Sequence, residues 1–372
     1  MRRVKESKYC RIIFAALFSF LLGCMITLNL TPIDKTCIVD NTDREYNIMQ
    51  NSKLKNPEVI VLILSAVKNS DRRNIIRETW LTLGNNVLGS GIKYRYKHYF
   101  VIGSLGLSND EILHISTEQS QNSDILILPL YDNYKNLTEK VLKSFEWLNL
   151  QYDYGLGYKY VLKCDDDSVV NLQSLLVEIP KLESTLINSN LHYPLNLPPE
   201  KLNHFITTNI QSNEKINTVN IENMSIYWGY FHGNARIKRN GKWQESEWIL
   251  CDNYVPYALG GGYILSRNLV SYIGKNVNYL RTFKSEDVSV GLWLSAINNI
   301  IRVHDIRFDT EWTSRGCKNY YLVTHHISPT ETKFMFESLV NNKQLCVREV
   351  EKRKYYLYNW SALPSECCVM VN

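Results

Sequence analysis

The chain has 372 residues, nine cysteines and a formal net charge of +5. A positive charge this small does not support nucleic-acid binding, but it is compatible with a nucleotide or an acidic polysaccharide as partner. The length allows for an N-terminal targeting segment followed by roughly 300 residues, enough for one large domain or two small ones.

The first feature along the chain is an apolar stretch without charged residues at 12–30, about long enough to cross a ~30 Å hydrocarbon core. Basic residues precede it and by the positive-inside rule keep that end cytosolic: Arg2, Arg3, Lys5, Lys8 and Arg11. We therefore predict a cytosolic tail at 1–11, a signal anchor at 12–30, a stem at 31–56 and a luminal domain at 57–372. A cleaved signal peptide is the alternative, but the apolar run exceeds the usual ~7–15 residues of such peptides.

The cysteines and the glycosylation motifs agree with an oxidising secretory compartment. Seven of the nine cysteines follow the apolar stretch, so at least one is unpaired or paired between chains. Cys164, inside an apolar run, is expected to be a free buried thiol. Acceptor motifs for N-glycans begin at Asn136, Asn223 and Asn359.

The remainder alternates strand-like and helix-like segments, which predicts an α/β fold with a mostly parallel sheet covered on both faces. The predicted strands are 59–67, 96–102, 125–130 and 158–163, and the predicted helices are 72–83, 137–150 and 172–184. A Rossmann-like nucleotide-binding half is the simplest interpretation.

Two further segments carry local signals. Residues 187–222 are rich in Asn, Pro, Thr and Lys, and we expect a disordered insertion there. Asn240-Gly241 is typical of a two-residue β-hairpin, because both residues tolerate positive φ.

The strongest chemical signal is the triplet Asp165-Asp166-Asp167 at the end of a predicted strand. Like charges this close repel one another, and a hard divalent cation such as Mg²⁺ or Mn²⁺ offsets the repulsion. In α/β sheets the ligand crevice lies outside the carboxyl ends of the strands, where the triplet falls. A solvated acidic turn is the alternative on spacing alone.

Two clusters follow in the second half. Three glycines, 260–262, allow a backbone to approach a ligand closely, or they form a flexible turn. Ser285-Glu286-Asp287-Val288 opens an apolar helical stretch, and acids at a helix start are favoured by the helix dipole. A carboxylate held there inside a cleft could also act as a general base.

Five stretches in series resemble the β-1,3-glycosyltransferase family, and the resemblance covers residue 57 to the end, interrupted by the insertion. They are Arg72-Arg73-Asn74-Ile75-Ile76-Arg77-Glu78-Thr79-Trp80, Phe100-Val101-Ile102-Gly103, Asp132-Asn133-Tyr134-Lys135-Asn136-Leu137-Thr138-Glu139-Lys140, Lys163-Cys164-Asp165-Asp166-Asp167 and Glu286-Asp287-Val288. The resemblance implies a GT-A fold and inverting transfer from a UDP-sugar, with a divalent cation on the diphosphate.

Within that family the second half is most similar to the galactosyltransferases of the glycosaminoglycan linkage region. The similar stretches are 227–231, 257–263, 304–311, 314–317, 321–325 and 358–362, with the cysteines at 367–368. This implies UDP-galactose as donor, a galactosyl-β-1,4-xylose acceptor on a proteoglycan, and a Golgi membrane location. The alternatives are a relative that uses UDP-N-acetylglucosamine or UDP-N-acetylgalactosamine, and an inactive membrane-anchored lectin on the same fold.

The resemblance also implies roles for single residues. Asp165 and Asp167 are expected at a Mn²⁺ or Mg²⁺ ion with His325, although His326 is an alternative by sequence alone. Asp287 is expected to be the base that takes the proton of the acceptor hydroxyl, with Glu286 as the neighbouring alternative.

The remaining candidates concern the donor. Residues expected to contact the nucleotide, its diphosphate or its sugar are Asp165, Asp166, Arg72, Arg73, Arg77, Asp132, Lys140, Gly261, Gly262 and Trp228. Helix-surface charge is the alternative for the three arginines, and Tyr134 is a weaker candidate. Sequence alone does not choose among the possible disulfide connectivities. The resemblance around Cys317 and Cys346 implies a disulfide between these two residues.

Overall fold

The structure is a computed structural model that describes residues 57–84, 96–187, 205–209, 224–368 and 370, all within one compact unit spanning Asn56–Asn372. The predicted tail, anchor and stem lie outside these residues. In the described part of the chain, no helix is both long and apolar enough to cross a membrane.

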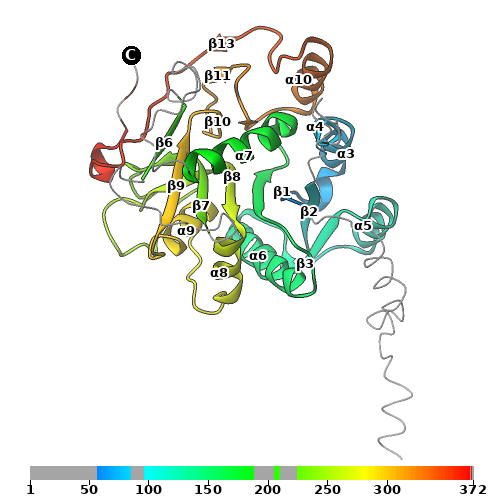
Figure 1. Ribbon diagram of the computed structural model, residues 1–372. Helices are drawn as coiled ribbons and strands as arrows, with labels where there is room; N and C mark the ends of the chain where they lie inside the picture. Colours follow the sequence, from blue (N-terminus) through cyan, green and yellow to red (C-terminus); the bar gives the residue numbers. More distant parts are fainter. Residues whose placement is uncertain (1–56, 85–95, 188–204, 210–223, 369, 371–372) are drawn as a thin grey trace, which may run out of the picture. The chain divides into compact units, whose positions relative to one another are not determined.

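The centre of the fold is an eight-stranded sheet with the order β3-β2-β1-β4-β8-β7-β9-β6 (Figure 1). Its strands are β1 (Val59–Leu64), β2 (Tyr96–Leu105), β3 (Ile125–Tyr131), β4 (Tyr160–Asp165), β6 (Ile206–Thr208), β7 (Ser225–His232), β8 (Tyr257–Ser266) and β9 (Ile300–Asp305). The strands of the first half, β3, β2, β1 and β4, are parallel, as expected. Strand β8 runs antiparallel to both β4 and β7, so the sheet as a whole is mixed.

Strand β1 is apolar at every position, and both of its faces are buried. Helices therefore cover both faces of the sheet. Val59, Val61 and Ile63 pack in one core, and the side chains between them pack in the other. The first core includes residues of α3 (Ser70–Glu78), α4 (Trp80–Leu83), α7 (Leu172–Ile187) and α10 (Pro329–Asn342). The second includes residues of α6 (Leu137–Asp153), α8 (Arg267–Lys275) and α9 (Glu286–Trp293). A smaller cluster seats α5 (Asn109–Asn122) through Ile115 near the β3 edge.

The helix predicted at 72–83 is in fact two helices. The chain leaves the helical conformation at Thr79 (φ −114°, ψ −111°), between α3 and α4. The Thr79 hydroxyl donates to the backbone carbonyl of Ile75, a local bond that competes with the regular helical ladder. Both helices still bury apolar side chains in the same core, which is why the periodicity predicts a single helix.

The prediction of a disordered insertion at 187–222 is wrong for residues 205–209. Strand β6 in this segment pairs antiparallel with β9 and buries Ile206. The Asn209 side chain donates to the carbonyl of Ile300 and accepts from the N–H of Arg302. These bonds satisfy the sheet edge, a gain that composition does not reveal. The rest of the predicted insertion, beyond the α7 terminus, lies outside the described residues.

The hairpin predicted at Asn240-Gly241 is also wrong. Gly241 does have a positive φ of 82°, and a turn forms, with the N–H of Gln244 donating to its carbonyl. The flanking residues are not strands, however. The side chain of Lys242 instead contacts aromatic rings from two other segments. The turn therefore forms as predicted, but these contacts replace the expected pairing of two strands.

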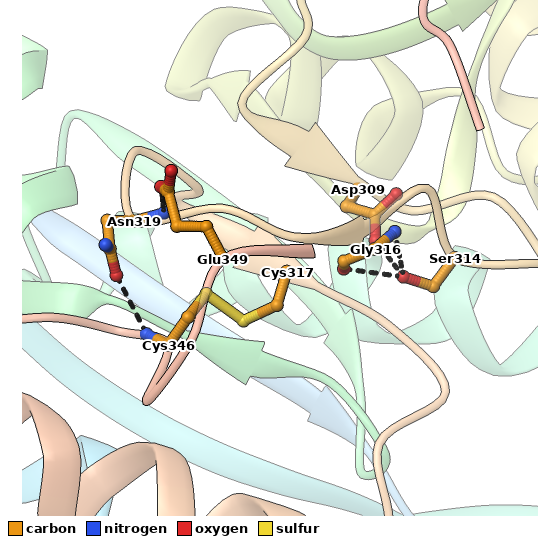
Figure 2. Close-up of a disulfide and its surroundings, with 7 residues drawn as sticks. All are labelled: Asp309, Ser314, Gly316, Cys317, Asn319, Cys346 and Glu349. Carbon is orange, nitrogen blue, oxygen red and sulfur yellow. Dashed lines mark hydrogen bonds between the residues drawn. A yellow bond between two sulfur atoms is a disulfide. The ribbon is translucent and has the colours of Figure 1, made fainter. Parts of the chain in front are cut away.

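The predicted disulfide between Cys317 and Cys346 is confirmed, with a Cα–Cα distance of 5.9 Å (Figure 2). It links β11 (Gly316–Cys317) to the segment after α10, and the N–H of Cys346 donates to the side chain of Asn319. Strand β11 also pairs with β13 (Val350–Glu351). Cys164 is buried and unpaired, as expected.

The C-terminal segment packs back onto the second half of the sheet. Tyr356 accepts a ring N–H of His304 at its carbonyl (2.9 Å) and donates its hydroxyl to the carbonyl of Phe231 (2.7 Å). Tyr358 and Cys367 are both nearly inaccessible to solvent. Cys367 also forms a disulfide with its neighbour Cys368, a pairing that the sequence did not predict. Tyr356, Tyr358 and Cys367 are therefore part of the core.

Replacing Cys317 by Ser should lower the free energy of unfolding by about 3–4 kcal/mol, because the disulfide closes a loop of 29 residues in the unfolded chain. Denaturant unfolding monitored by circular dichroism measures this. Cys251→Ser is the matched control, since Cys251 is exposed and unpaired, and it should leave the unfolding midpoint unchanged. Alkylation of Cys317 in the native, unreduced protein would rule out the bond.

Candidate functional site

The aspartate triplet lies at the carboxyl end of β4, where the three side chains have separate surroundings. Asp166 accepts hydrogen bonds from the hydroxyl of Ser65 and the amide of Asn69, both at 2.8 Å. Asp166 therefore ties the end of β4 to the loop after β1, and burial raises the pKa of its carboxyl. Asp165 and Asp167 remain available to a ligand, with side chains 28% and 26% exposed.

A histidine from a distant segment joins these two aspartates. The Nε2 atom of His325 lies 3.5 Å from an oxygen of Asp165 and 3.3 Å from an oxygen of Asp167. A second, three-stranded sheet with the order β10-β12-β5 brings it there. In this sheet β12 (Val323–Thr324), just before the histidine, pairs with β5 (Val169–Val170), just after the triplet, and with β10 (Phe308–Asp309). The ring of His326 instead stacks on Trp312, with centroids 4.5 Å apart.

The three groups suit a divalent cation. Their ligand atoms all lie within 4.8 Å of one another, and carboxylate oxygens are preferred by Mg²⁺ and Mn²⁺. Burial disfavours an imidazolium, but the carboxylates of Asp165 and Asp167 outweigh burial and raise the pKa of His325 to about 9. Burial likewise opposes ionisation of Asp165, and Lys163 and His325 outweigh it to hold that pKa at about 2. The site thus concentrates negative charge that a cation would neutralise.

Lys163, on β4 two residues before Asp165, connects this cluster to a second pair of carboxylates. Its ammonium is buried and donates to Asp165 (3.0 Å), to Glu286 (2.9 Å) and to the carbonyl of Gly260 (2.7 Å). Three acceptors satisfy the three donors of a lysine. Burial opposes the charge, but the two carboxylates outweigh it and raise the pKa of Lys163.

The second pair, Glu286 and Asp287, begins α9. Both oxygens of Glu286 are occupied, one by the hydroxyl of Tyr263 and the other by Lys163. Burial raises the pKa of Glu286 to about 7, although Lys163 opposes the shift. Asp287 accepts the N–H groups of Gly260 (3.0 Å) and Val288 (2.9 Å), is only partly buried, and borders the cleft. Burial raises the pKa of Asp287 as well.

The three glycines lie within β8 and not in a turn. A Cβ atom on Gly260 would come within 3.1 Å of Glu286 and 3.4 Å of Asp287. On Gly261 it would clash with His325 at 2.5 Å, and on Gly262 it would meet Val323 at 2.8 Å. The glycines are needed because the strand approaches the protein's own site residues closely, which is a different reason from the predicted contact with a ligand.

The aspartate triplet, His325, Glu286 and Asp287 border one cleft of about 640 Å³. Its wall also contains rings that the sequence analysis passed over, Trp243 and Trp312, together with the weaker candidate Tyr134. Lys242, next to Trp243, borders the cleft as well. The only sequence signals for these rings are the pair Lys242-Trp243 in a polar loop and the isolated Trp312 after Glu311. Neither belongs to a motif.

Several predicted donor residues lie elsewhere. The guanidinium of Arg73 is buried and bonded to Glu118, and Arg77 pairs with Glu118 and Asp124. Arg72 donates to the carbonyl of Ile327 at 3.4 Å. None of the three arginines borders the cleft, and Arg73 and Arg77 belong instead to an ion-pair network with Glu118 and Asp124.

Of the other donor candidates, Asp132 and Gly261 border the cleft but Lys140, Gly262 and Trp228 do not. Lys140 is buried and positions Asp132 through a 2.6 Å ion pair. Trp228 is 1% exposed and donates its indole N–H to Asp305. The prediction that Trp228 lines a sugar pocket is therefore wrong, because β7 buries the ring in the core.

Replacing Lys163 by Met should destabilise the protein by about 3–5 kcal/mol, because it leaves Asp165 and Glu286 without their shared cation. Thermal and denaturant unfolding provide the measurement. Lys143→Met is the matched control, since the Lys143–Glu146 pair is about a third exposed on each side and should contribute less than about 1 kcal/mol. Equal unfolding midpoints for the two variants would show that Lys163 does not hold the site together.

Comparison with known proteins shows to which family the chain belongs. Residues 71–193 and 197–305 match the galactosyltransferase family. Mouse beta-1,3-galactosyltransferase 6 is 39% identical over 309 residues, covering 83% of this chain and 81% of the mouse protein. Hydroxyproline O-galactosyltransferase GALT2 of Arabidopsis thaliana is 27% identical over 288 residues, covering 76% of this chain and 35% of the plant protein.

Among solved structures, a glycosyltransferase involved in glycosylation of the major capsid of PBCV-1 aligns with a TM-score of 0.34 and 11% identity, covering 75% of this chain and 99% of that one. The sequence matches decide the assignment, and they confirm the resemblance carried by the motifs. The chain belongs to the galactosyltransferase family, and it is a UDP-sugar-dependent hexosyltransferase.

Proposed function

We propose that the protein is an inverting β-1,3-galactosyltransferase of the GT-A type, which moves galactose from UDP-galactose to the 3-hydroxyl of galactosyl-β-1,4-xylose in the proteoglycan linkage region. One observation carries the proposal: a single cleft is bordered by the cluster of Asp165, Asp167 and His325 and also by the carboxylate of Asp287. Such a cleft can hold the diphosphate of a sugar nucleotide at one place and accept a proton at another. The name of the mouse relative supports the sugar and the linkage.

The donor side follows from charge. Asp165, Asp167 and His325 would hold Mn²⁺ or Mg²⁺, and the bound cation would offset the negative charge that develops on the departing diphosphate. Lys163 keeps Asp165 ionised and fixes its orientation. Asp132, held by Lys140, borders the same cleft and is placed for contacts with the nucleotide.

The acceptor side needs one base, because inversion proceeds by a single displacement. Asp287 suits this role better than Glu286, whose two oxygens are already bonded to Tyr263 and Lys163. The N–H groups that Asp287 accepts fix its orientation while the carboxylate still faces the cleft. Burial raises its pKa, which makes the ionised group a stronger base at neutral pH.

The proposed location rests on the N-terminal sequence and on the family resemblance. The apolar stretch at 12–30 with basic residues before it would anchor a single-pass type II protein, with the enzyme domain in the Golgi lumen. The bond between Cys317 and Cys346 is consistent with an oxidising compartment.

A donor and acceptor screen tests the function. The full-length protein in detergent, with Mn²⁺, should transfer galactose from UDP-galactose to a galactosyl-β-1,4-xyloside, and nuclear magnetic resonance should identify a β-1,3 linkage in the product. A preference for UDP-N-acetylglucosamine or UDP-N-acetylgalactosamine would replace the proposed donor. Binding of sugars without transfer from any donor would indicate a lectin.

Replacing Asp287 by Asn should reduce the transfer rate by about 10²–10⁴-fold, the usual contribution of a general base, while calorimetry shows UDP binding with Mn²⁺ nearly intact. The residual rate should also lose the decline that the wild type shows as pH falls through the raised pKa of Asp287, because only the ionised form accepts a proton.

Asp167→Asn is the matched variant, because it removes a carboxylate from the same cleft without touching the base. It should weaken the cation-dependent binding of UDP. An Asp287→Asn enzyme that transfers at close to the wild-type rate would exclude Asp287 as the base.

A further inference from the structure

An aromatic wall borders the cleft beside the site described above. It consists of Tyr134, Trp243 and Trp312, which come from three separate segments and gather around the ammonium of Lys242. That ammonium lies 4.4 Å from the ring centroid of Tyr134, 5.3 Å from that of Trp312 and 5.8 Å from that of Trp243. The two indoles meet edge to face with centroids 5.4 Å apart.

The wall is open to ligands. Trp312 is 52% exposed and borders the cleft, so part of its ring is accessible to a ligand. Lys242 makes no ion pair within the part of the chain that the structure describes, although acidic groups line the same cleft. Its N–H donors therefore remain available to hydroxyl groups of a ligand.

The wall also adjoins the reacting groups at two places. Trp312 stacks on His326, the residue that follows His325 of the cation cluster. Tyr134 borders the same cleft as Asp287, and burial together with the charges of Asp287 and Glu286 raises the pKa of its hydroxyl. A ligand stacked on the wall would therefore lie in the same cleft as Asp287.

Pyranose rings fit these features, because their C–H faces pack on indole and phenol rings while their hydroxyl edges accept hydrogen bonds. We propose that Tyr134, Trp243 and Trp312 form the acceptor subsite and stack a hexose of an uncharged disaccharide acceptor, with Lys242 donating hydrogen bonds to its hydroxyls. The proposal rests on the proposed function, since it takes Asp287 as the group that faces the acceptor.

Replacement of Trp312 tests the wall. Trp312→Ala should raise the KM for the acceptor about tenfold, a change worth about 1.4 kcal/mol. It should leave the KM for UDP-galactose and its slow hydrolysis without acceptor within about twofold, as expected for a group that only packs on the acceptor. Trp312→Phe, which keeps an aromatic face, should restore most of the acceptor affinity. Tyr279→Ala is the control, because Tyr279 is 86% exposed and does not border the cleft.

Two kinds of kinetic result would overturn the proposal. A raised KM for UDP-galactose with an unchanged KM for the acceptor would assign the wall to the uridine ring and overturn the proposal. An unchanged KM for both, or an equal effect of Trp312→Phe, would also overturn it.

The test is independent of the particular acceptor. Kinetics are measured with whichever disaccharide the wild type uses best, so failure of galactosyl-xylose alone refutes the proposed function and not the wall. Where no transfer occurs, saturation-transfer magnetic resonance with UDP and Mg²⁺ measures binding of the disaccharide directly. Equal binding to the wild type and to Trp312→Ala would then refute the wall.

Discussion

The buried ammonium of Lys163 is the contact on which the two halves of the site depend. It lies on β4, the last parallel strand of the first half, and it bonds Asp165 on the same strand and Glu286 at the start of α9. Its third acceptor is the carbonyl of Gly260 on β8, the strand at which the sheet direction reverses. A single charge thus links the cluster of Asp165, Asp167 and His325 to the carboxylate pair at the start of α9, and the low dielectric around the ammonium strengthens these bonds.

Close packing of the β8 backbone also holds the site residues together. Because β8 carries glycine at 260, 261 and 262, it can lie against the carboxylates of α9 and against His325 without a Cβ atom between them. The small sheet of β5, β10 and β12 brings His325 to the aspartates by pairing the residues next to each. Neither feature depends on the nucleotide, so the site is largely assembled before a substrate arrives.

Much of the first half could be predicted because its signals are local. Apolar runs identify β1 to β4, and the triplet after β4 falls at the expected edge of the sheet. The failures concern partners that are remote in sequence. Arg77 is bonded to Asp124, 47 residues away, and Trp228 to Asp305, 77 residues away. Composition alone could not separate these core contacts from ligand contacts.

The same reasoning explains why the aromatic wall was missed. Its rings come together only in three dimensions, and the turn at Gly241 predicted a hairpin where the chain instead presents Lys242 and Trp243 to the cleft. Resemblance to a family predicted the aspartates, Asp287 and His325 as site residues, and the structure places all of them at the border of one cleft. Resemblance gave no signal for acceptor contacts in loops, where relatives with different acceptors have reason to differ.

Because the C-terminal segment packs in the core but lies outside the cleft, two kinds of sequence change should have different effects. Every residue of the cleft precedes residue 326, yet the side chains of Tyr356, Tyr358 and Cys367 complete the core behind β7. A truncation before Tyr356 that keeps residue 325 would spare every residue of the cleft and still expose this apolar face, so the shortened chain is expected to misfold. A substitution at Asp287 would have the opposite character, because it changes a residue that borders the cleft and leaves the packing of the C-terminal segment intact.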